Sequence, residues 1–417
     1  MLDRGQRTTI TVRLIGRDTA SRWRRLLITE GLAVPSGGGC AVALADLSGH
    51  DRPDDAIADM RRLAGTEPLI VLQRLGDVLP NDVPADVVLL RCDPERPAAL
   101  IRALRAAALH RLYASAAGVR LRALASLGQT FPYAQSDGAA GPTAMLTEPH
   151  PGVLAMLSSA GWQELVTPLT SSQTLRLLEN NHASALIVHL SDVEEHRLPI
   201  LKLIRRQTEL RELPVAVVAR EWTGERVGQW LDAGADLVAY PDEVPGILGL
   251  LRGAAMRFRT RQSLSAALTA SAITDDGHAS PILGPRVFER VVDEHRELGD
   301  RIAYGAIELK PADRGSEPDI AEAGIYMAMA LSPLELIVRP RADLFFVAMP
   351  YADRFFGGRV MRSMETLIED LKFGDEPDPV LMTARHRCID GEGLPPAEAR
   401  LRLERMLARD TRPAAFA

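Results

Sequence analysis

The sequence predicts an α/β protein made of two tandem parallel α/β units followed by a C-terminal α+β domain. Short apolar runs alternate with helical patterns over residues 8–110, and the alternation begins again after residue 142. Buried strands that alternate with amphipathic helices are typical of a parallel sheet covered on both faces. Because two stretches of about 110 residues share this pattern, we expect one fold repeated in tandem.

Each of the two units has five candidate strands separated by segments of helical periodicity. In the first unit they are ITVRLIG (10–16), LAVPS (32–36), AVALADL (41–47), LIVLQR (69–74) and DVVLLR (86–91). In the second unit they are TAMLTE (143–148), ELVTPLT (164–170), SALIVHL (184–190), PVAVVAR (214–220) and ADLVAYP (235–241). The Gly-, Pro- and Ser-rich segment 128–142 is expected to link the units.

The second unit ends in a long helical segment, 244–272, which has an apolar stripe. The stripe consists of Leu248, Leu251, Ala255, Phe258, Leu264 and Leu268. Spacings near three and four predict either the seam of a homodimer or packing against the chain's own domain. Beyond it, residues 280–412 follow the order α-β-α-β-β-α-β-α, which predicts an α+β sheet with a central hairpin from LELIV (334–338) and LFFVAM (344–349).

Composition excludes several classes of function. A net charge of −6 and a pI near 5.9 argue against a bulk electrostatic grip on nucleic acid or acidic lipid. The first residues lack the apolar segment of a secretory signal, and no apolar run reaches the roughly 18–20 residues that span a bilayer. Cys40, Cys92 and Cys388 lie far apart, which argues against disulfides and a zinc site. We therefore expect a cytoplasmic protein without a metal or cofactor.

Three motifs carry a resemblance to a known family. ALADLSG places Asp46 at the end of the third strand, GADLVAYP lies at the fifth strand of the second unit, and the hairpin corner reads Arg339-Pro340-Arg341-Ala342-Asp343-Leu344-Phe345. The corner aligns with an Arg-x-Gly-Gly-Asp-Glu-Phe motif, and the order of the expected domains resembles that of PleD-like and PopA-like response regulators. The resemblance implies two tandem flavodoxin-like (βα)5 receiver domains followed by an α+β GGDEF-like domain of the nucleotidyl-cyclase type. Its implied bounds are 8–127 for the first receiver-like domain, 142–260 for a pseudo-receiver, 244–272 for the connecting helix and 280–412 for a degenerate GGDEF domain.

The resemblance makes Asp46 the candidate phosphoacceptor, while most of the other residues that a receiver needs are replaced. A receiver needs an acidic pair for Mg²⁺, a Thr or Ser after the fourth strand and a Lys after the fifth. In the first unit these positions read Gly16-Arg17 or Arg17-Asp18, Gln73, and Arg91 or Cys92. In the second unit the acceptor, hydroxyl and lysine positions read His189, Ala219 and Tyr240. Since the first lysine of the chain is Lys202, no lysine switch is expected in the first unit, and Asp46 alternatively caps the loop after its strand.

The corner of the third domain is changed in the same way. Arg341 and Ala342 replace the two glycines, Leu344 replaces the Glu, and Asp343 and Phe345 remain. Side chains at the glycine positions would fill the space of a nucleotide phosphate. Glu308 and Asp343 are vestigial metal candidates. In the degenerate inhibitory-site window, Glu335 keeps a carboxylate, while Ser332 stands in place of the Arg. Arg339 and Arg341 are candidate contacts for a ligand phosphate, or surface ion-pair partners.

These features leave two principal expectations for function. One is a non-catalytic, PopA-like scaffold or adaptor with protein partners, acting in cell-cycle control and regulated proteolysis. The other is a receptor gated by cyclic di-GMP or by phosphorylation. A diguanylate cyclase is the weaker alternative, because the GGDEF signature is lost.

Overall fold

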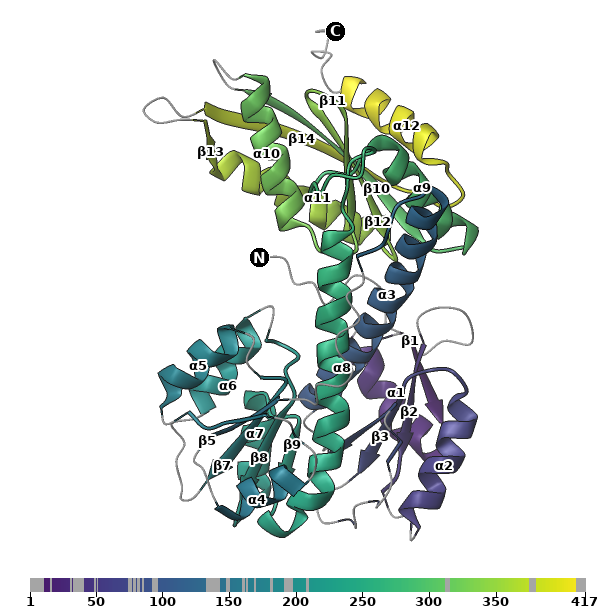
Figure 1. Ribbon diagram of the computed structural model, residues 1–417. Coiled ribbons are helices and arrows are strands. Elements are labelled where there is room, and N and C mark those ends of the chain that lie inside the picture. Colours follow the sequence, from purple (N-terminus) through teal and green to yellow (C-terminus); the bar gives the residue numbers. More distant parts are fainter. Residues whose placement is uncertain are drawn as a thin grey trace, which may run out of the picture. The chain divides into compact units, whose positions relative to one another are not determined.

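The computed structural model divides the chain into two compact units (Figure 1). It describes residues 11–409 except 16, 31, 33–40, 49, 51, 74–76, 78–79, 81–82, 85, 92–96, 133–142, 148–150, 160–161, 163, 169, 181–182, 191–197, 208–209, 312–315 and 375–379. One unit spans Thr9–Arg111 and Gln135–Gln262, and the other spans Leu112–Ala134 and Ser263–Ala417. The boundaries at 111/112 and 262/263 fall inside long helices, and the boundary at 134/135 falls within the segment 128–142 predicted as a linker.

The first sheet is parallel and has the strand order β1-β2-β3-β4. Its elements are β1 (Thr11–Ile15), α1 (Arg17–Thr29), β2 (Ala41–Asp46), α2 (Pro53–Ala64), β3 (Leu69–Gln73), β4 (Val87–Arg91) and α3 (Ala98–Ser126). Every residue of β3 is buried, as expected for a strand covered on both faces. Trp23 of α1 and Leu100 of α3 pack on one face, and Ile57 and Met60 of α2 pack on the other. The strand expected at 32–36 lies outside the described residues except for Leu32, which is buried and not in a strand.

The second sheet is parallel with the order β6-β5-β7-β8-β9. Its elements are β5 (Thr143–Thr147), α4 (Pro151–Ser159), β6 (Glu164–Val166), α5 (Ser171–Glu179), β7 (Ala185–Leu190), α6 (Leu198–Arg206), β8 (Val215–Ala219), α7 (Gly224–Ala233), β9 (Leu237–Ala239), the 3-10 turn η3 (Pro241–Glu243) and α8 (Val244–Ala270). Counted within this sheet the order is 2-1-3-4-5, which is the flavodoxin-like doubly wound arrangement. The predicted parallel α/β character is confirmed.

The apolar stripe of α8 is covered within a single chain, which agrees with the second of its two expectations, packing against its own chain, rather than with an exposed seam. Leu248, Leu251 and Ala255 belong to the core on one face of the second sheet, and Phe258 belongs to the core on the other. Leu264 and Leu268 are also buried. The stripe had the right periodicity for a seam, but the cores of its own chain occupy it. Phe258→Glu would therefore disturb folding rather than separate two chains.

The third sheet is antiparallel with the order β11-β12-β10-β14-β13. Its elements are α9 (Pro285–Glu297), β10 (Ile302–Pro311), α10 (Glu317–Ala330), β11 (Leu336–Arg341), β12 (Leu344–Pro350), α11 (Arg354–Asp370), β13 (Lys372–Phe373), β14 (Val380–Asp390) and α12 (Pro396–Arg409). The predicted hairpin is β11–β12, and the βαββαβ order of the main strands is that of the ferredoxin-like split βαβ motif. The short edge strand β13 has no counterpart among the sequence predictions.

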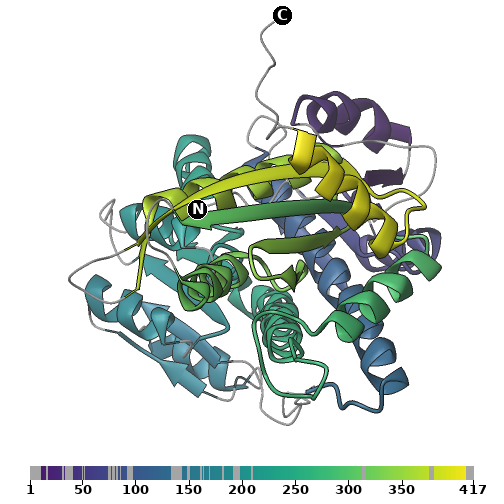
Figure 2. The same ribbon diagram turned by 90° about the horizontal axis from the view of Figure 1, so that it is seen from above.

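Two layers of helices enclose the third sheet. Figures 1 and 2 show α10 and α11 on one face and α9 and α12 on the other. Consecutive residues of β12 point to opposite faces: Phe345 joins the core under α10 and α11, while the Phe346 ring lies 5.5 Å from the ring of Phe288 in α9. Gly324 of α10 lies against Phe345, because a Cβ atom built there would be 2.3 Å from Cε1 of that ring. Glycine is therefore required where α10 crosses the hairpin.

Candidate functional site: the hairpin corner and the end of strand β2

The corner between β11 and β12 is held together by its own side chains. Arg339 donates two hydrogen bonds to the carbonyl oxygen of Ala342, from Nε at 3.0 Å and from Nη2 at 2.6 Å. The Arg339 guanidinium also lies 5.7 Å from the centroid of the Phe345 ring. One of the two arginines predicted to contact a ligand phosphate thus stabilises the hairpin.

The two vestigial metal candidates lie at the same end of adjacent strands. Glu308 of β10 is opposite Leu344 of β12, next to Asp343. Arg341 joins the carboxylates: its Nε lies 2.8 Å from Oδ1 of Asp343, and its Nη2 lies 3.7 Å from Oε1 of Glu308. The hydrogen bond from Arg341 lowers the pKa of Asp343 below its ordinary value. The structure therefore brings the predicted pair together, with a guanidinium between its members.

Two further cations contact Glu308, and sequence reasoning missed both of them as part of this site. Arg385 of β14 is directly opposite Glu308 and forms a salt bridge with it. Lys310 lies two residues along β10, on the same face, with Nζ 3.9 Å from Oε2 of Glu308. Strand alternation could have identified Lys310, whereas Arg385 required the pairing of β10 with β14. Hard divalent cations bind oxygen ligands, and at this corner the oxygen atoms face basic groups instead.

Among the residues that the structure describes, no group of three His, Cys, Asp or Glu side chains is arranged to hold a metal ion. The Glu308–Asp343 pair with its three basic neighbours is an ion-pair cluster. Glu308 is largely buried, with 14% of its side chain exposed, whereas the side chains of Lys310 and Arg341 are about half exposed. The cluster can fix the positions of β10, β12 and β14 relative to one another.

Glu308→Gln is expected to lower the free energy of unfolding by about 1–2 kcal/mol. The substitution keeps the shape of the side chain and removes a carboxylate that contacts Lys310, Arg341 and Arg385, while Asp343 still pairs with Arg341. Hydrogen bonds to charged groups contribute roughly 1.5–3 kcal/mol, which solvent exposure reduces. Urea denaturation followed by far-UV circular dichroism measures the effect. The control is Glu317→Gln. The Glu317 side chain is 72% exposed and its carboxylate lies 3.7 Å from Arg339, so this substitution should change the free energy of unfolding by less than about 0.5 kcal/mol. Equal stability of Glu308→Gln and wild type would show that the cluster contributes nothing.

The inhibitory-site window forms a hydrogen-bonded turn at the start of β11. The Glu335 carboxylate accepts a hydrogen bond from the amide of Ser332 at 2.6 Å, and the Ser332 hydroxyl accepts one from the amide of Leu334 at 3.3 Å. Ser332 and Glu335 are both buried. Their polar atoms cap this turn, so the structure gives them a role in folding.

Asp46, the candidate phosphoacceptor, ends β2 as predicted and is half-buried. Its Oδ2 accepts a hydrogen bond from the Trp23 indole at 3.2 Å, and its Oδ1 accepts one from the Ser48 amide at 3.0 Å. The second bond is the loop cap that the sequence also allowed. The position expected for the receiver's acidic pair includes Gly16, outside the described residues, and the side chains of Arg17 and Asp18 are not described.

Arg91, one of the two residues expected at the position of the switch lysine, forms a buried ion pair. Its side chain is 2% exposed, and two of its nitrogens lie 2.7 Å from the two carboxylate oxygens of Glu243 in η3. The pair joins the end of the first sheet to the start of α8. Burial alone raises the pKa of Glu243, but the hydrogen bonds from Arg91 and from the Tyr240 amide bring it below its ordinary value. Sequence reasoning missed this pair because its members are 152 residues apart.

The corresponding positions of the second unit are parts of the core. His189 lies in β7 with 5% of its surface exposed, and Ala219 ends β8 with 1% exposed. Tyr240 begins the η3 turn, where its amide donates to Glu243 at 2.9 Å. Of the three cysteines, Cys388 is described, and burial raises the pKa of its thiol to about 12; Cys40 and Cys92 lie outside the described residues.

No family model matches the chain, and no curated protein matches it. Among solved structures, the receiver domain of a histidine kinase from Syntrophus aciditrophicus is 18% identical, with a TM-score of 0.24, over 27% of this chain and 92% of that one. The linker and phosphoreceiver segment of RcsC from E. coli is 17% identical, with a TM-score of 0.24, over 62% of this chain and 97% of that one. A protein described as a two-component response regulator with a GGDEF domain is 13% identical, with a TM-score of 0.23, over 58% of this chain and 96% of that one.

Proposed function

We propose that this protein is a non-catalytic signalling scaffold or adaptor of the response-regulator type, with a PopA-like role in a two-component or cyclic di-GMP pathway. The observation that carries the proposal is the ion-pair cluster at the hairpin corner. Glu308 and Asp343, the carboxylates that a cyclase would use for Mg²⁺, contact Arg341, and Glu308 also contacts Arg385. In this proposal the domain retains its fold and acts through its surface.

The same corner argues against diguanylate cyclase activity. Cyclic di-GMP synthesis from GTP requires a triphosphate to approach glycine backbone closely and two metal ions to neutralise it. Here Arg341 and Ala342 occupy the glycine positions, and Arg339 bonds to the carbonyl of Ala342. A nucleotide would have to displace these bonds and also compete with guanidinium groups for the carboxylates.

The purified full-length chain is expected to form no cyclic di-GMP from GTP in the presence of Mg²⁺. Product formation is followed by chromatography against a buffer blank, with Asp343→Ala as the matched variant. Turnover above the blank that disappears in Asp343→Ala would refute the non-catalytic assignment.

A receptor gated by cyclic di-GMP or by phosphorylation is the second candidate, because Asp46 lies at the end of a parallel strand and two arginines lie at the corner. Titration with cyclic di-GMP, and separately with acetyl phosphate and Mg²⁺, distinguishes the candidates. Binding that is lost in Arg339→Ala, or a phosphate adduct on Asp46 that changes oligomeric state, would favour the receptor. Homodimerisation through surfaces other than the α8 stripe stays a proposal that light scattering tests.

An adaptor needs an exposed surface for its partner, and α10 offers one. Ile325, Tyr326 and Met329 expose 43%, 42% and 70% of their surfaces. The most informative experiment is an affinity pull-down from native cells with wild type and Met329→Glu as baits. Leu63→Glu, which changes a side chain on α2 that is 60% exposed, is the control. A partner captured equally by all three baits would place the binding surface elsewhere.

A further inference from the structure

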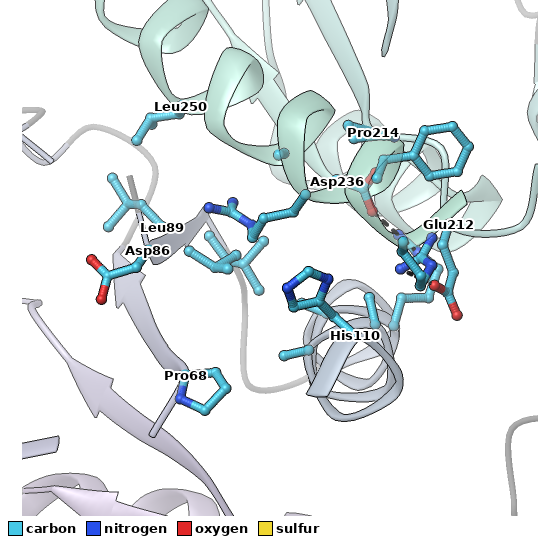
Figure 3. A pocket seen from close by; sticks show the side chains of 18 of the residues that line it. Pro68, Asp86, Leu89, His110, Glu212, Pro214, Asp236 and Leu250 are labelled. Atoms are coloured by element: carbon cyan, nitrogen blue, oxygen red, sulfur yellow. Dashed lines mark hydrogen bonds and ion pairs between the residues drawn. The ribbon is translucent and has the colours of Figure 1, made fainter. Parts of the chain in front are cut away.

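A pocket of about 450 Å³ lies inside the unit formed by Thr9–Arg111 and Gln135–Gln262 (Figure 3). One side is formed by β4 and α3, and the other by the residues around 212–214, the start of β9 and α8. Its volume is within the range of about 300–1,000 Å³ that small-molecule sites occupy. None of the residues singled out from the sequence as a candidate site lines it, apart from Leu251 and Phe258 of the α8 stripe.

Most of the wall is apolar. The aliphatic and aromatic contributions include Leu89, Leu250, Leu251, Pro68, Pro214 and Phe258. Alanines of α3, among them Ala106, keep that side of the pocket open, because larger side chains there would fill it. An apolar wall of this kind favours a ligand with a substantial hydrocarbon or aromatic body.

The charged groups in the wall have an excess of positive charge. Five arginines line the pocket against four carboxylates. The carboxylates already have cationic partners: Asp86 has Arg61 at 2.7 Å, Asp236 has Arg205 at 2.8 Å, Glu67 has Arg13 at 2.7 Å, and Glu212 has Arg261. A ligand with several negative charges would be repelled by these four carboxylates. A single anionic group matches the one arginine by which the positive charges of the wall outnumber its negative charges.

Two side chains mark where that anionic group would lie. The His110 ring rises from α3 into the pocket (Figure 3), and its Nδ1 is buried without a hydrogen-bond partner. Burial and the nearby charges of Arg261 and Arg257 lower the pKa of His110, so the ring is neutral near pH 7 and can donate one hydrogen bond. Burial also lowers the pKa of Arg257 to about 10, opposed by the charge of Asp86. A desolvated guanidinium is stabilised by an anion that enters the same apolar space.

We propose that this pocket binds a small amphipathic organic anion with an aromatic or branched aliphatic body and a single carboxylate or sulfonate group. The body packs among Leu89, Leu251 and Phe258, and the anionic group faces Arg257 and His110. Because the wall comes from both α/β halves of the unit, bound ligand stabilises that unit by mass action. A neutral apolar molecule would leave the buried Nδ1 of His110 without a hydrogen-bond partner, which is unfavourable.

The test uses isothermal titration calorimetry of the full-length chain with anilinonaphthalene sulfonate as the probe. We expect one site per chain with a dissociation constant on the order of 20 µM, the affinity that typical ligand efficiency gives a probe of this size. The uncharged analogue N-phenylnaphthylamine, which has the same rings and no sulfonate, should bind at least roughly tenfold more weakly. Equal binding of the two probes would overturn recognition of an anion.

Variants locate the site. Arg257→Leu should weaken the sulfonate at least roughly tenfold, while Arg252→Leu, which removes an exposed arginine from the same helix, should leave it within about twofold. Ala106→Trp should abolish binding by filling the pocket, and Ala114→Trp, at an exposed position of α3, should not. Ala106→Leu replaces the tryptophan variant if thermal denaturation shows that the latter is unfolded. Unchanged affinity in both Arg257→Leu and Ala106→Leu would refute the proposal.

Discussion

Replacing Arg91 by methionine is expected to lower the free energy of unfolding of its unit by about 3–5 kcal/mol, because the change leaves the Glu243 carboxylate without its partner. The Arg91 side chain is 2% exposed and that of Glu243 is 19% exposed, so water cannot fully replace the lost bonds. All four tryptophans, Trp23, Trp162, Trp222 and Trp230, lie in this unit. Urea denaturation followed by tryptophan fluorescence therefore reports the loss directly.

Two controls separate this pair from ordinary surface charges. Arg61→Met removes the partner of Asp86, a carboxylate that is 57% exposed, and should cost about 1 kcal/mol or less in charge interactions. The double variant Arg91→Met/Glu243→Met should be more stable than either single variant, since no uncompensated charge remains. If the loss in free energy of unfolding of the double variant equals the sum of the losses of the two single variants, a direct interaction between the two side chains is contradicted.

The pair should also produce a defined pH dependence. The folded-state pKa of Glu243 lies below its ordinary value, so its contribution to stability is complete above the unfolded-state pKa of about 4.3. The contribution is lost as pH falls through the folded-state pKa. Without Arg91, burial raises the folded-state pKa of Glu243, so the stability difference between wild type and Arg91→Met should be largest near neutral pH and should shrink as pH falls toward and below the ordinary glutamate pKa.

Phe345→Ala is expected to lower the free energy of unfolding of the C-terminal unit by about 3–5 kcal/mol, the usual cost of a cavity left by a buried phenylalanine. The ring is fully buried in the core under α10 and α11 and contacts Gly324 closely. Because the C-terminal unit contains no tryptophan, far-UV circular dichroism should report this destabilisation, while the tryptophan transition should not move.

Asp343→Ala is the matched control from the same corner. The Asp343 side chain is 37% exposed and its partner Arg341 is 53% exposed, so the loss should be about 1 kcal/mol or less. A small effect of Phe345→Ala with a large effect of Asp343→Ala would contradict the view that the hairpin is kept for its core. A larger loss of stability in Phe345→Ala than in Asp343→Ala would instead indicate that the hairpin is kept for folding and that function depends on the surface of the domain.

Local pattern was sufficient for the secondary structure around both sites. The hydrophobic runs at 41–47 and 69–74 became β2 and β3, and the hairpin became β11 and β12, because burial on one or two faces imposes a periodicity that can be read along the chain. The placement of Asp46 at the end of a strand followed from the same pattern. Periodicity also identified the α8 stripe, but it could not say which surface covers the stripe.

The sequence by itself determined that the corner lacks the glycines of a nucleotide site, because residue type alone shows that positions 341 and 342 carry side chains. Only the tertiary structure decided what the remaining charges do. Arg385 reaches Glu308 from 77 residues away, Arg91 reaches Glu243 from 152 residues away, and the pocket needs walls from both halves of its unit. Each depends on which strands and helices become neighbours. The packing of whole apolar faces determines which elements become neighbours, and the local spacing of charged residues in the sequence carries no information about that packing.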